Sequence, residues 1–175
     1  MSYTCTISTP LGAMTAAAEG DALVGLWFIG QKHYPTRTAH WKSDGACAVF
    51  EALRGYLQTY FAGGTDRFEM ELKPPGSAFR RAVWDILLQI PRGQVKTYGQ
   101  IAKETAKSLE LTAMSARAVG GAVARNPISI LIPCHRVIAS NGALRGYAGG
   151  LDRKAELLRL EGANLNNLQL AAKPS

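Results

Sequence analysis

The stretch SARAVGGAVARNPISILIPCHRVI, residues 115–138, indicates how the second half of the chain folds. Ser115 is suited to cap a helix, and the small residues after it form a short one. Asn126-Pro127 ends that helix, because proline disfavours a helical conformation in the residue before it. The apolar residues 128–133 then predict a buried strand or extended segment. Cys134 therefore follows directly on a buried apolar run.

The rest of the second half is mostly helical. Helices are predicted at residues 79–90, 98–107, 116–125 and 152–159, with Ser77 and Thr97 as further caps and Gly162 after the last one. The second and third resemble a helix-turn-helix, although the connector 108–114 between them is longer than the usual tight turn.

The first half predicts a small antiparallel sheet covered by one helix. Strands are expected at residues 3–7, 13–18, 22–28 and 68–72, and a helix at residues 44–61. Lys73-Pro74-Pro75-Gly76 continues neither a helix nor a strand, so we place a domain boundary there. Residues 1–75 form an α/β domain and residues 76–175 a mostly α-helical domain.

Composition narrows the class of protein. With 175 residues, 47% of them hydrophobic and 19% charged, the chain suits one globular unit or two small ones. No apolar run approaches the roughly 20 residues that span a bilayer, and the N-terminus lacks a secretory or transit signal. Three cysteines without a CxxC pair make a disulfide framework unexpected. We therefore expect a cytoplasmic protein with no membrane partner.

The positive charge is concentrated in the second half. Residues 77–161 carry thirteen Lys and Arg against six Asp and Glu, whereas residues 1–76 carry six against seven. This asymmetry favours contact between the second half and a polyanion, most simply the phosphates of nucleic acid. A solvated basic surface is the alternative.

Cys134 is the candidate nucleophile. The potentially cationic His135 and Arg136 follow it, a setting that can lower the pKa of a thiol. The alternative is a small buried hydrophobic residue. Because consecutive residues of a strand face opposite sides, either the backbone bends after Pro133 or a water relays the proton between Cys134 and His135. Glu161 is a candidate to orient the imidazole, although most glutamates at helix ends are solvated.

The loop 142–150 contains four glycines around Tyr147 and could bring backbone N–H groups close to a ligand. A flexible surface loop is the alternative. The chain has neither a GxGxxG nor a GxxxxGK[ST] motif opening a helix, so no nucleotide cofactor is expected.

Taken together, these stretches resemble the 6-O-alkylguanine-DNA alkyltransferases, also called methylated-DNA-protein-cysteine methyltransferases. Pro133-Cys134-His135-Arg136-Val137 is similar to the active-site signature of that family. Residues 116–122 resemble the recognition helix of the family and residues 126–127 the turn that follows it. Residues 95–100 resemble the segment with the active-site tyrosine, residues 146–150 the substrate loop and residues 157–162 the closing helix. It is continuous from Ser77 to Gly162 and looser in the first half.

The resemblance implies a role for each of these residues. Cys134 would accept the alkyl group, His135 would be its water-mediated base, and Glu161 would orient the histidine. Tyr98 would donate a proton to a guanine ring nitrogen, and Asn126 would brace the active-site turn. The lesion pocket would be bordered by Pro133, Val137, Tyr147, Ala148 and Gly149.

The resemblance also implies how DNA is bound. Arg117 would be inserted into the base stack in place of the extruded nucleotide, because the reacting oxygen is inaccessible inside a duplex. The small residues of the same helix would let it approach the minor groove. The implied contact residues are Tyr98, Ser115, Ala116, Arg117, Gly120 and Gly121.

The implied protein is a monomer that acts once, on double-stranded alkylated DNA, without a cofactor. Its implied fold is a ribonuclease H-like α/β domain followed by a domain with a winged helix-turn-helix. The chain departs from the family in the longer connector 108–114 and in Ala148, where some members carry serine. Some relatives bind zinc in the first domain, but Cys5, Cys47, His33 and His40 lack the close ligand pairs of common zinc modules, so we expect no metal.

Two other functions are possible from the residues. One is a sensor that binds alkylated guanine without repairing it, but such proteins lack the acceptor cysteine. The other is a Cys-His hydrolase, which needs a direct dyad that adjacent residues do not offer easily.

Overall fold

The computed structural model describes residues 1–36, 38–65 and 67–167. The chain divides into two units. The first comprises Met1–Pro75 and Pro127–Leu131, and the second comprises Gly76–Asn126 and Ile132–Ser175. The chain thus returns to the first unit for five residues shortly before Cys134.

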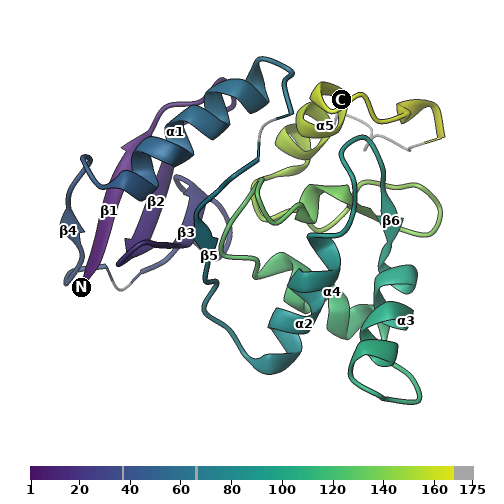
Figure 1. Ribbon diagram of the computed structural model, residues 1–175. Helices are drawn as coiled ribbons and strands as arrows, with labels where there is room; N and C mark the ends of the chain where they lie inside the picture. The colour runs from purple at the N-terminus through teal and green to yellow at the C-terminus, as the bar shows by residue number, and fades with distance from the viewer. Residues whose placement is uncertain (37, 66, 168–175) are drawn as a thin grey trace. The chain divides into compact units, whose positions relative to one another are not determined.

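A mixed sheet forms the first unit. Its strands are β1 (Ser2–Ile7), β2 (Met14–Glu19), β3 (Ala22–Phe28), β4 (Lys42–Ser43) and β5 (Glu71–Leu72), in the order β4-β1-β2-β3-β5. The three long strands are antiparallel, as predicted, and lie side by side in Figure 1. The two short edge strands are parallel to their neighbours, so the sheet is mixed rather than antiparallel. Only two residues of the predicted strand 68–72 are paired, and β4 had no sequence signal.

Helix α1 (Ala48–Phe61) lies across the sheet in Figure 1. It begins four residues later than predicted, because Asp44 accepts a hydrogen bond from the N–H of Ala46 and holds this segment in a turn. The helical spacing predicted a face made of Cys47, Phe50, Leu53, Leu57 and Phe61. The three central residues of this set are buried, whereas Cys47 and Phe61 are half-buried. Val49 and Tyr60 are buried as well. Helical spacing of the apolar residues therefore predicted the packed face but not the first turn.

The apolar run 128–133 is buried but is not the predicted strand. Ile128 forms one isolated bridge to Leu26 of β3, and the chain then turns. Ile130 lies in the left-handed region with φ 72°, which a β-branched residue rarely adopts. An apolar run in a turn is buried as completely as one in a strand, so hydropathy could not distinguish the two.

The second unit contains four helices in its described part, as predicted. They are α2 (Ala78–Leu87), α3 (Tyr98–Ser108), α4 (Ala116–Ala124) and α5 (Leu151–Leu160). The strands β6 (Lys96–Thr97) and β7 (Val137–Ile138) pair in parallel, and short 3-10 turns lie at Cys134–Arg136 and Leu165–Asn167. The predicted caps are confirmed: the side chains of Ser77, Thr97 and Ser115 accept hydrogen bonds from the N–H of Arg80, Gln100 and Ala118.

Trp84 joins α2 to α4. Its indole Nε1 donates a hydrogen bond to the carbonyl of Ala122 at 3.0 Å, and the ring is 1% exposed. Val83 and Leu87 of α2 and Val119 of α4 are fully buried. This packing fixes the helix that carries Arg117.

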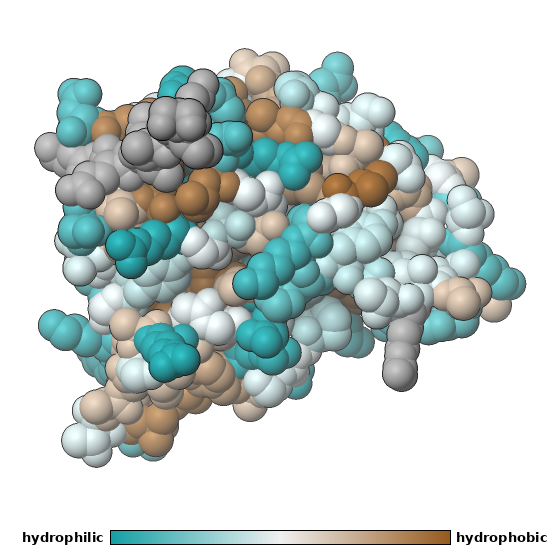
Figure 2. All heavy atoms as spheres, turned by 180° about the vertical axis from the view of Figure 1, so that it is seen from behind, coloured by the Kyte–Doolittle hydropathy of each residue, from teal (hydrophilic) through white to brown (hydrophobic). Residues whose placement is uncertain are grey.

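The surface shows no membrane-spanning element in the described part. None of its helices is long and apolar enough to cross a bilayer. On the face seen in Figure 2, hydrophobic residues occur in small groups separated by hydrophilic ones. Such scattered groups are ordinary for a protein surface.

Candidate active site

The cysteine signature bends instead of continuing as a strand. Residues Cys134–Arg136 form a 3-10 turn directly after Pro133, so the backbone bends there. No hydrogen bond between the side chains of Cys134 and His135 is recorded in the described part of the chain, so the bend does not replace a water relay. Cys134 is 5% exposed. Asn126 donates hydrogen bonds from Nδ2 to the sulfur of Cys134 at 3.0 Å and to the carbonyl of Ile132 at 2.8 Å. Asn126 thus holds both the sulfur and the backbone that leads to it.

The environment of the Cys134 thiol differs from the prediction. Burial raises its pKa, because a thiolate loses hydration in the interior. The hydrogen bond from Asn126 and the positive charge of Lys154 oppose this rise without cancelling it. The prediction that neighbouring cations lower the pKa of the Cys134 thiol was therefore wrong, because burial has the larger effect on this pKa.

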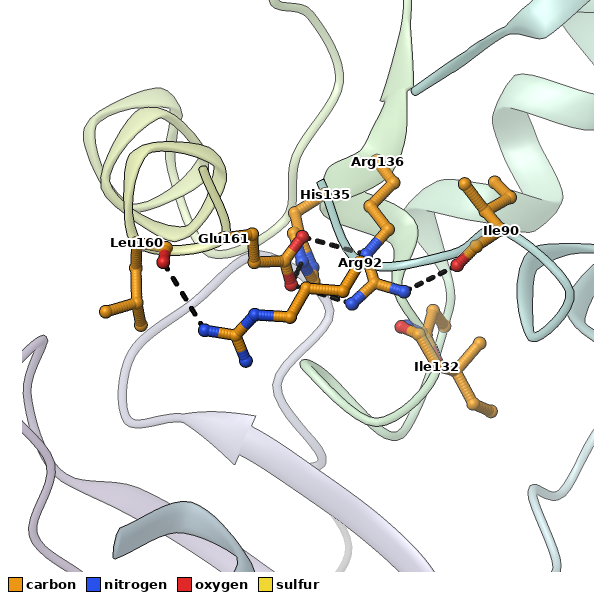
Figure 3. Close-up of polar contacts among 8 residues, drawn as sticks. Ile90, Arg92, Ile132, His135, Arg136, Leu160 and Glu161 are labelled. Carbon is orange, nitrogen blue, oxygen red and sulfur yellow. Dashed lines mark hydrogen bonds and ion pairs between the residues drawn. The ribbon is translucent and has the colours of Figure 1, made fainter. Parts of the chain in front are cut away.

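His135 is paired with Glu161. Its Nε2 lies 2.7 Å from Oε1 of Glu161, and both side chains are completely buried (Figure 3). Burial lowers the pKa of His135, which favours the neutral imidazole. We assign its proton to Nε2, because the carboxylate accepts there. Nδ1 is then an acceptor, and it has no hydrogen-bond partner among the described residues.

Arg136 also binds Glu161. Its Nε donates to Oε2 at 2.9 Å and its Nη2 to Oε1 at 2.8 Å, while Nη1 donates to the carbonyl of Ile90 at 2.6 Å. The hydrogen bonds from His135 and Arg136 hold the pKa of Glu161 far below its usual range despite its burial. From the sequence, Arg136 was predicted only to be a cation beside Cys134. Its charge is instead paired with the carboxylate that contacts His135.

A second arginine fixes the end of α5. Arg92 donates from Nη2 to the carbonyl of Leu160 at 3.3 Å, next to Glu161 (Figure 3). The segment that follows α2 is thereby tied to the helix end that carries the carboxylate.

Lys154 is the site residue that the sequence analysis missed. It is fully buried on α5, and its Nζ donates to the carbonyls of Val137 and Arg145, the second at 2.8 Å. Burial lowers the pKa of Lys154 to about 8, and the negative charge of Cys134 opposes that shift. The available signal was its spacing, because Lys154 shares the helix face of the buried Leu157 and Leu158.

Tyr98 begins α3 and reaches the glycine loop. Its hydroxyl donates to the carbonyl of Arg145 at 2.8 Å, the same oxygen that Lys154 binds. Burial, with a smaller contribution from the charge of Cys134, raises the pKa of Tyr98 to about 12. The phenol is therefore protonated at any physiological pH. A Cβ on Gly146 would lie 2.7 Å from this hydroxyl, so only glycine fits there.

The start of α4 presents the predicted DNA-contact residues. Ser115, Ala116 and Arg117 are exposed. Gly120 and Gly121 are half-buried, and a Cβ on Gly120 would lie 4.0 Å from the ring of Tyr98. The structure therefore brings Tyr98 next to this helix.

The predicted pocket residues lie around the same centre. Pro133, Val137 and Gly149 are buried and Ala148 is half-buried. Tyr147 is 8% exposed, and its ring meets His135 edge-on with centroids 6.5 Å apart. Tyr147 thus packs on the imidazole from within the loop.

The described residues contain no group of three or more His, Cys, Asp or Glu side chains placed to hold a metal ion. Of the four residues considered for zinc, Cys5 is buried, Cys47 is half-buried, and His33 and His40 are exposed.

Known proteins match this chain along most of its length. A family model described as 6-O-methylguanine DNA methyltransferase, DNA binding domain, matches residues 78–163. A Mycobacterium tuberculosis protein named methylated-DNA–protein-cysteine methyltransferase is 42% identical over 156 residues, which are 89% of this chain and 90% of that protein. A Methanosarcina acetivorans protein of the same name is 38% identical over 161 residues, 92% of this chain and 99% of that one.

Solved structures agree with the sequence matches. The crystal structure of M. tuberculosis O6-methylguanine methyltransferase has a TM-score of 0.79 and 42% identity, over 93% of each chain. M. tuberculosis OGT in complex with DNA has a TM-score of 0.80 and 40% identity, over 91% of this chain and 92% of that one. The chain belongs to the methylated-DNA–protein-cysteine methyltransferase family.

Proposed function

We propose that this protein repairs alkylated DNA by moving the alkyl group from the 6-oxygen of guanine to the sulfur of Cys134. The observation that carries the proposal is the position of that sulfur, which lies 3.0 Å from the amide nitrogen of Asn126. The next residue in the chain, His135, is buried and paired with Glu161. A neutral imidazole with an acceptor nitrogen can act as the general base that activates a thiol nucleophile. The family and its named relatives support the same reaction.

The first step activates the thiol. A water molecule carries the proton of Cys134 to Nδ1 of His135, and Glu161 stabilises the resulting imidazolium through Nε2. The charge of Lys154 and the amide of Asn126 favour the thiolate. Activation is needed here because burial raises the pKa of the free thiol.

The second step is the transfer. The sulfur attacks the alkyl carbon, a carbon–sulfur bond forms, the carbon–oxygen bond breaks, and its electron pair passes to guanine. Tyr98 gives its phenol proton to a guanine ring nitrogen, which makes guanine a better leaving group. The imidazolium releases its proton to solvent, from which the phenolate is reprotonated. The product is a thioether on Cys134, and each molecule acts once.

The DNA interface of the proposal is α4. Its exposed start, with Ser115, Ala116 and Arg117, faces the minor groove of double-stranded DNA, and Gly120 and Gly121 permit close approach. Arg117 fills the place of the extruded nucleotide. The bound nucleotide then lies against Pro133, Val137, Tyr147, Ala148 and Gly149.

We also propose a fold type for each of the two domains. Helices α3 and α4 with the β6–β7 ladder form a winged helix-turn-helix, and the sheet with α1 is ribonuclease H-like. We take residues 1–75 and 76–175 as the two domains of a cytoplasmic monomer.

Labelled substrate tests the proposal. The protein is mixed with a duplex that contains 6-O-methylguanine with a radioactive methyl group. We expect one label per protein molecule and none on Cys134→Ala, which should still bind the duplex because phosphate contacts dominate affinity. Tight binding by the wild type without transfer would overturn the proposal and favour a sensor.

A further inference from the structure

The outer edge of β1 is covered by another strand for only part of its length. β4 pairs with Tyr3 and Thr4 and ends there. The carbonyl of Thr4 accepts a hydrogen bond from the N–H of Asp44, so the backbone groups of Thr4 point to this edge. Thr6, two residues further on, points its N–H and carbonyl the same way, because backbone direction alternates along a strand. Neither group of Thr6 has a recorded hydrogen bond along this edge in the described part of the chain.

Two hollows meet at this open edge, and Thr6 lines both. The larger, about 600 Å³, lies between the end of β1 and α1, where Ile7, Pro10, Leu57 and Phe61 give it an apolar lining. Arg54 is the charged side chain among the described residues that line it. The smaller, about 260 Å³, is polar and is lined by Thr4, Thr15, Tyr34 and Trp41 among others.

An open strand edge between two hollows matches the way in which an extended peptide is recognised. Main-chain hydrogen bonds attach the peptide to the edge, and its side chains, which alternate between the faces, enter pockets on either side. The apolar lining and Arg54 select an apolar and an acidic side chain on the same face of the peptide. Residues on one face are separated by an even number of positions.

We propose that the β1 edge at Thr6 binds an extended segment of another protein that carries an acidic and an apolar residue an even number of positions apart. The segment adds a short strand beside β1, directly after the place where β4 ends. It is anchored by the N–H and carbonyl of Thr6, by the hollow at Leu57 and Phe61, and by the guanidinium of Arg54. None of these residues belongs to the alkyl-transfer site.

A second copy of this chain fits the edge poorly. Paired through the same edge, it would offer Thr6 and Ser8, which are polar, while its Ile7 is buried in its own core at 6% exposure. It would therefore leave the apolar hollow unfilled. Its Arg54 would add a like charge instead of the acid that the edge favours.

A peptide display library tests the proposal. Random heptapeptides are panned against the full chain, and one enriched peptide is synthesised for affinity measurement. We expect an acidic and an apolar residue at even spacing, and slower hydrogen exchange of the Thr6 amide in the complex. Thr6→Pro removes the edge donor but not the β1–β2 pairing, since proline is tolerated where the N–H faces away from the ladder. It should weaken binding about tenfold, the effect of one hydrogen bond. Thr6→Val keeps the donor and should bind normally.

Arg54→Glu provides an independent arm if Thr6→Pro fails to fold. Panning against Arg54→Glu should exchange the acidic preference for a basic one. All three variants should keep the wild-type rate of alkyl transfer. The proposal is wrong if no peptide is enriched, if enriched peptides bind Thr6→Pro as well as Thr6→Val, if Arg54→Glu keeps the acidic preference, or if the chain self-associates through this edge.

Discussion

The hydroxyl of Tyr98 donates a hydrogen bond to the carbonyl of Arg145 at 2.8 Å, and Lys154 donates to the same oxygen at the same distance. One carbonyl therefore joins the first residue of α3, the buried lysine of α5 and the glycine loop. The next residue, Gly146, has φ 71° and leaves no room for a Cβ beside the hydroxyl. The position of Tyr98 thus depends on the backbone of the loop.

Gly146→Ala should lower the rate of alkyl transfer, because the new Cβ would displace the Tyr98 hydroxyl. We expect a loss of at least about tenfold, equivalent to about 1.4 kcal/mol. Gly30→Ala is the matched control, since Gly30 has φ 80° but open space around its Cβ position. Both variants should lose about 1 kcal/mol of stability to backbone strain. Equal transfer rates in the two variants would mean that the position of Tyr98 does not matter.

Lys154→Met should raise the pKa of the Cys134 thiol further, because the nearby positive charge is lost. The rate of reaction with free 6-O-alkylguanine should fall roughly tenfold near neutral pH, and its rise with pH should move to higher pH. In the wild type this charge is present below about pH 8 and is lost above it. Arg159→Met, which removes an exposed charge from the same helix, should leave the profile unchanged. An unshifted profile in Lys154→Met would show that the lysine acts only by packing.

Glu161→Gln should destabilise the fold by about 3 kcal/mol at pH 7, because it leaves the charge of Arg136 without its buried partner. The folded protein depresses the pKa of Glu161 below its ordinary value of 4.5. The carboxylate therefore contributes its full stabilisation above about pH 4.5, and that contribution is lost as pH falls below this value. Denaturation in urea at pH 7 and at pH 4 measures the effect, and the gap between variant and wild type should narrow at pH 4. A gap independent of pH would contradict the ion-pair account.

Arg117→Ala should separate nucleotide extrusion from chemistry. At saturating duplex we expect the single-turnover rate to fall about tenfold or more, because unstacking a base costs a few kcal/mol. Reaction with the free alkylguanine base should be nearly unchanged, since nothing is extruded. Unchanged duplex kinetics would remove Arg117 from the mechanism, and equal losses on both substrates would indicate structural damage.

The sequence predicted local features better than long-range ones. The three caps Ser77, Thr97 and Ser115 are confirmed, and so is the centre of the predicted buried face of α1, because each depends on neighbours within about one helical turn. The edge strand β4 was missed, because two residues give no periodic signal. β5 lies within the predicted strand 68–72, but its parallel pairing with β3 was not predicted, because the two strands are distant in sequence.

The candidate active site shows the same contrast between predictable local features and unpredicted long-range ones. The contact between His135 and Glu161 was anticipated through the family resemblance. The pairing of Arg136 with Glu161, the burial of Lys154 and the raised pKa of Cys134 were not. All three depend on how segments that are far apart in sequence pack together and exclude water. The spacing of residues within one segment carries no information about such packing.

The mass of the protein after exposure to duplex DNA containing 6-O-methylguanine tests the central claim most directly. We predict a single gain of about 14 Da, the difference between a thiol and its methyl thioether, located on the peptide that contains Cys134. Excess methylated DNA should not increase it, and Cys134→Ala should gain nothing. A gain on the Cys5 or Cys47 peptide, or an unchanged protein mass with demethylated DNA, would contradict the assignment of Cys134 as the alkyl acceptor.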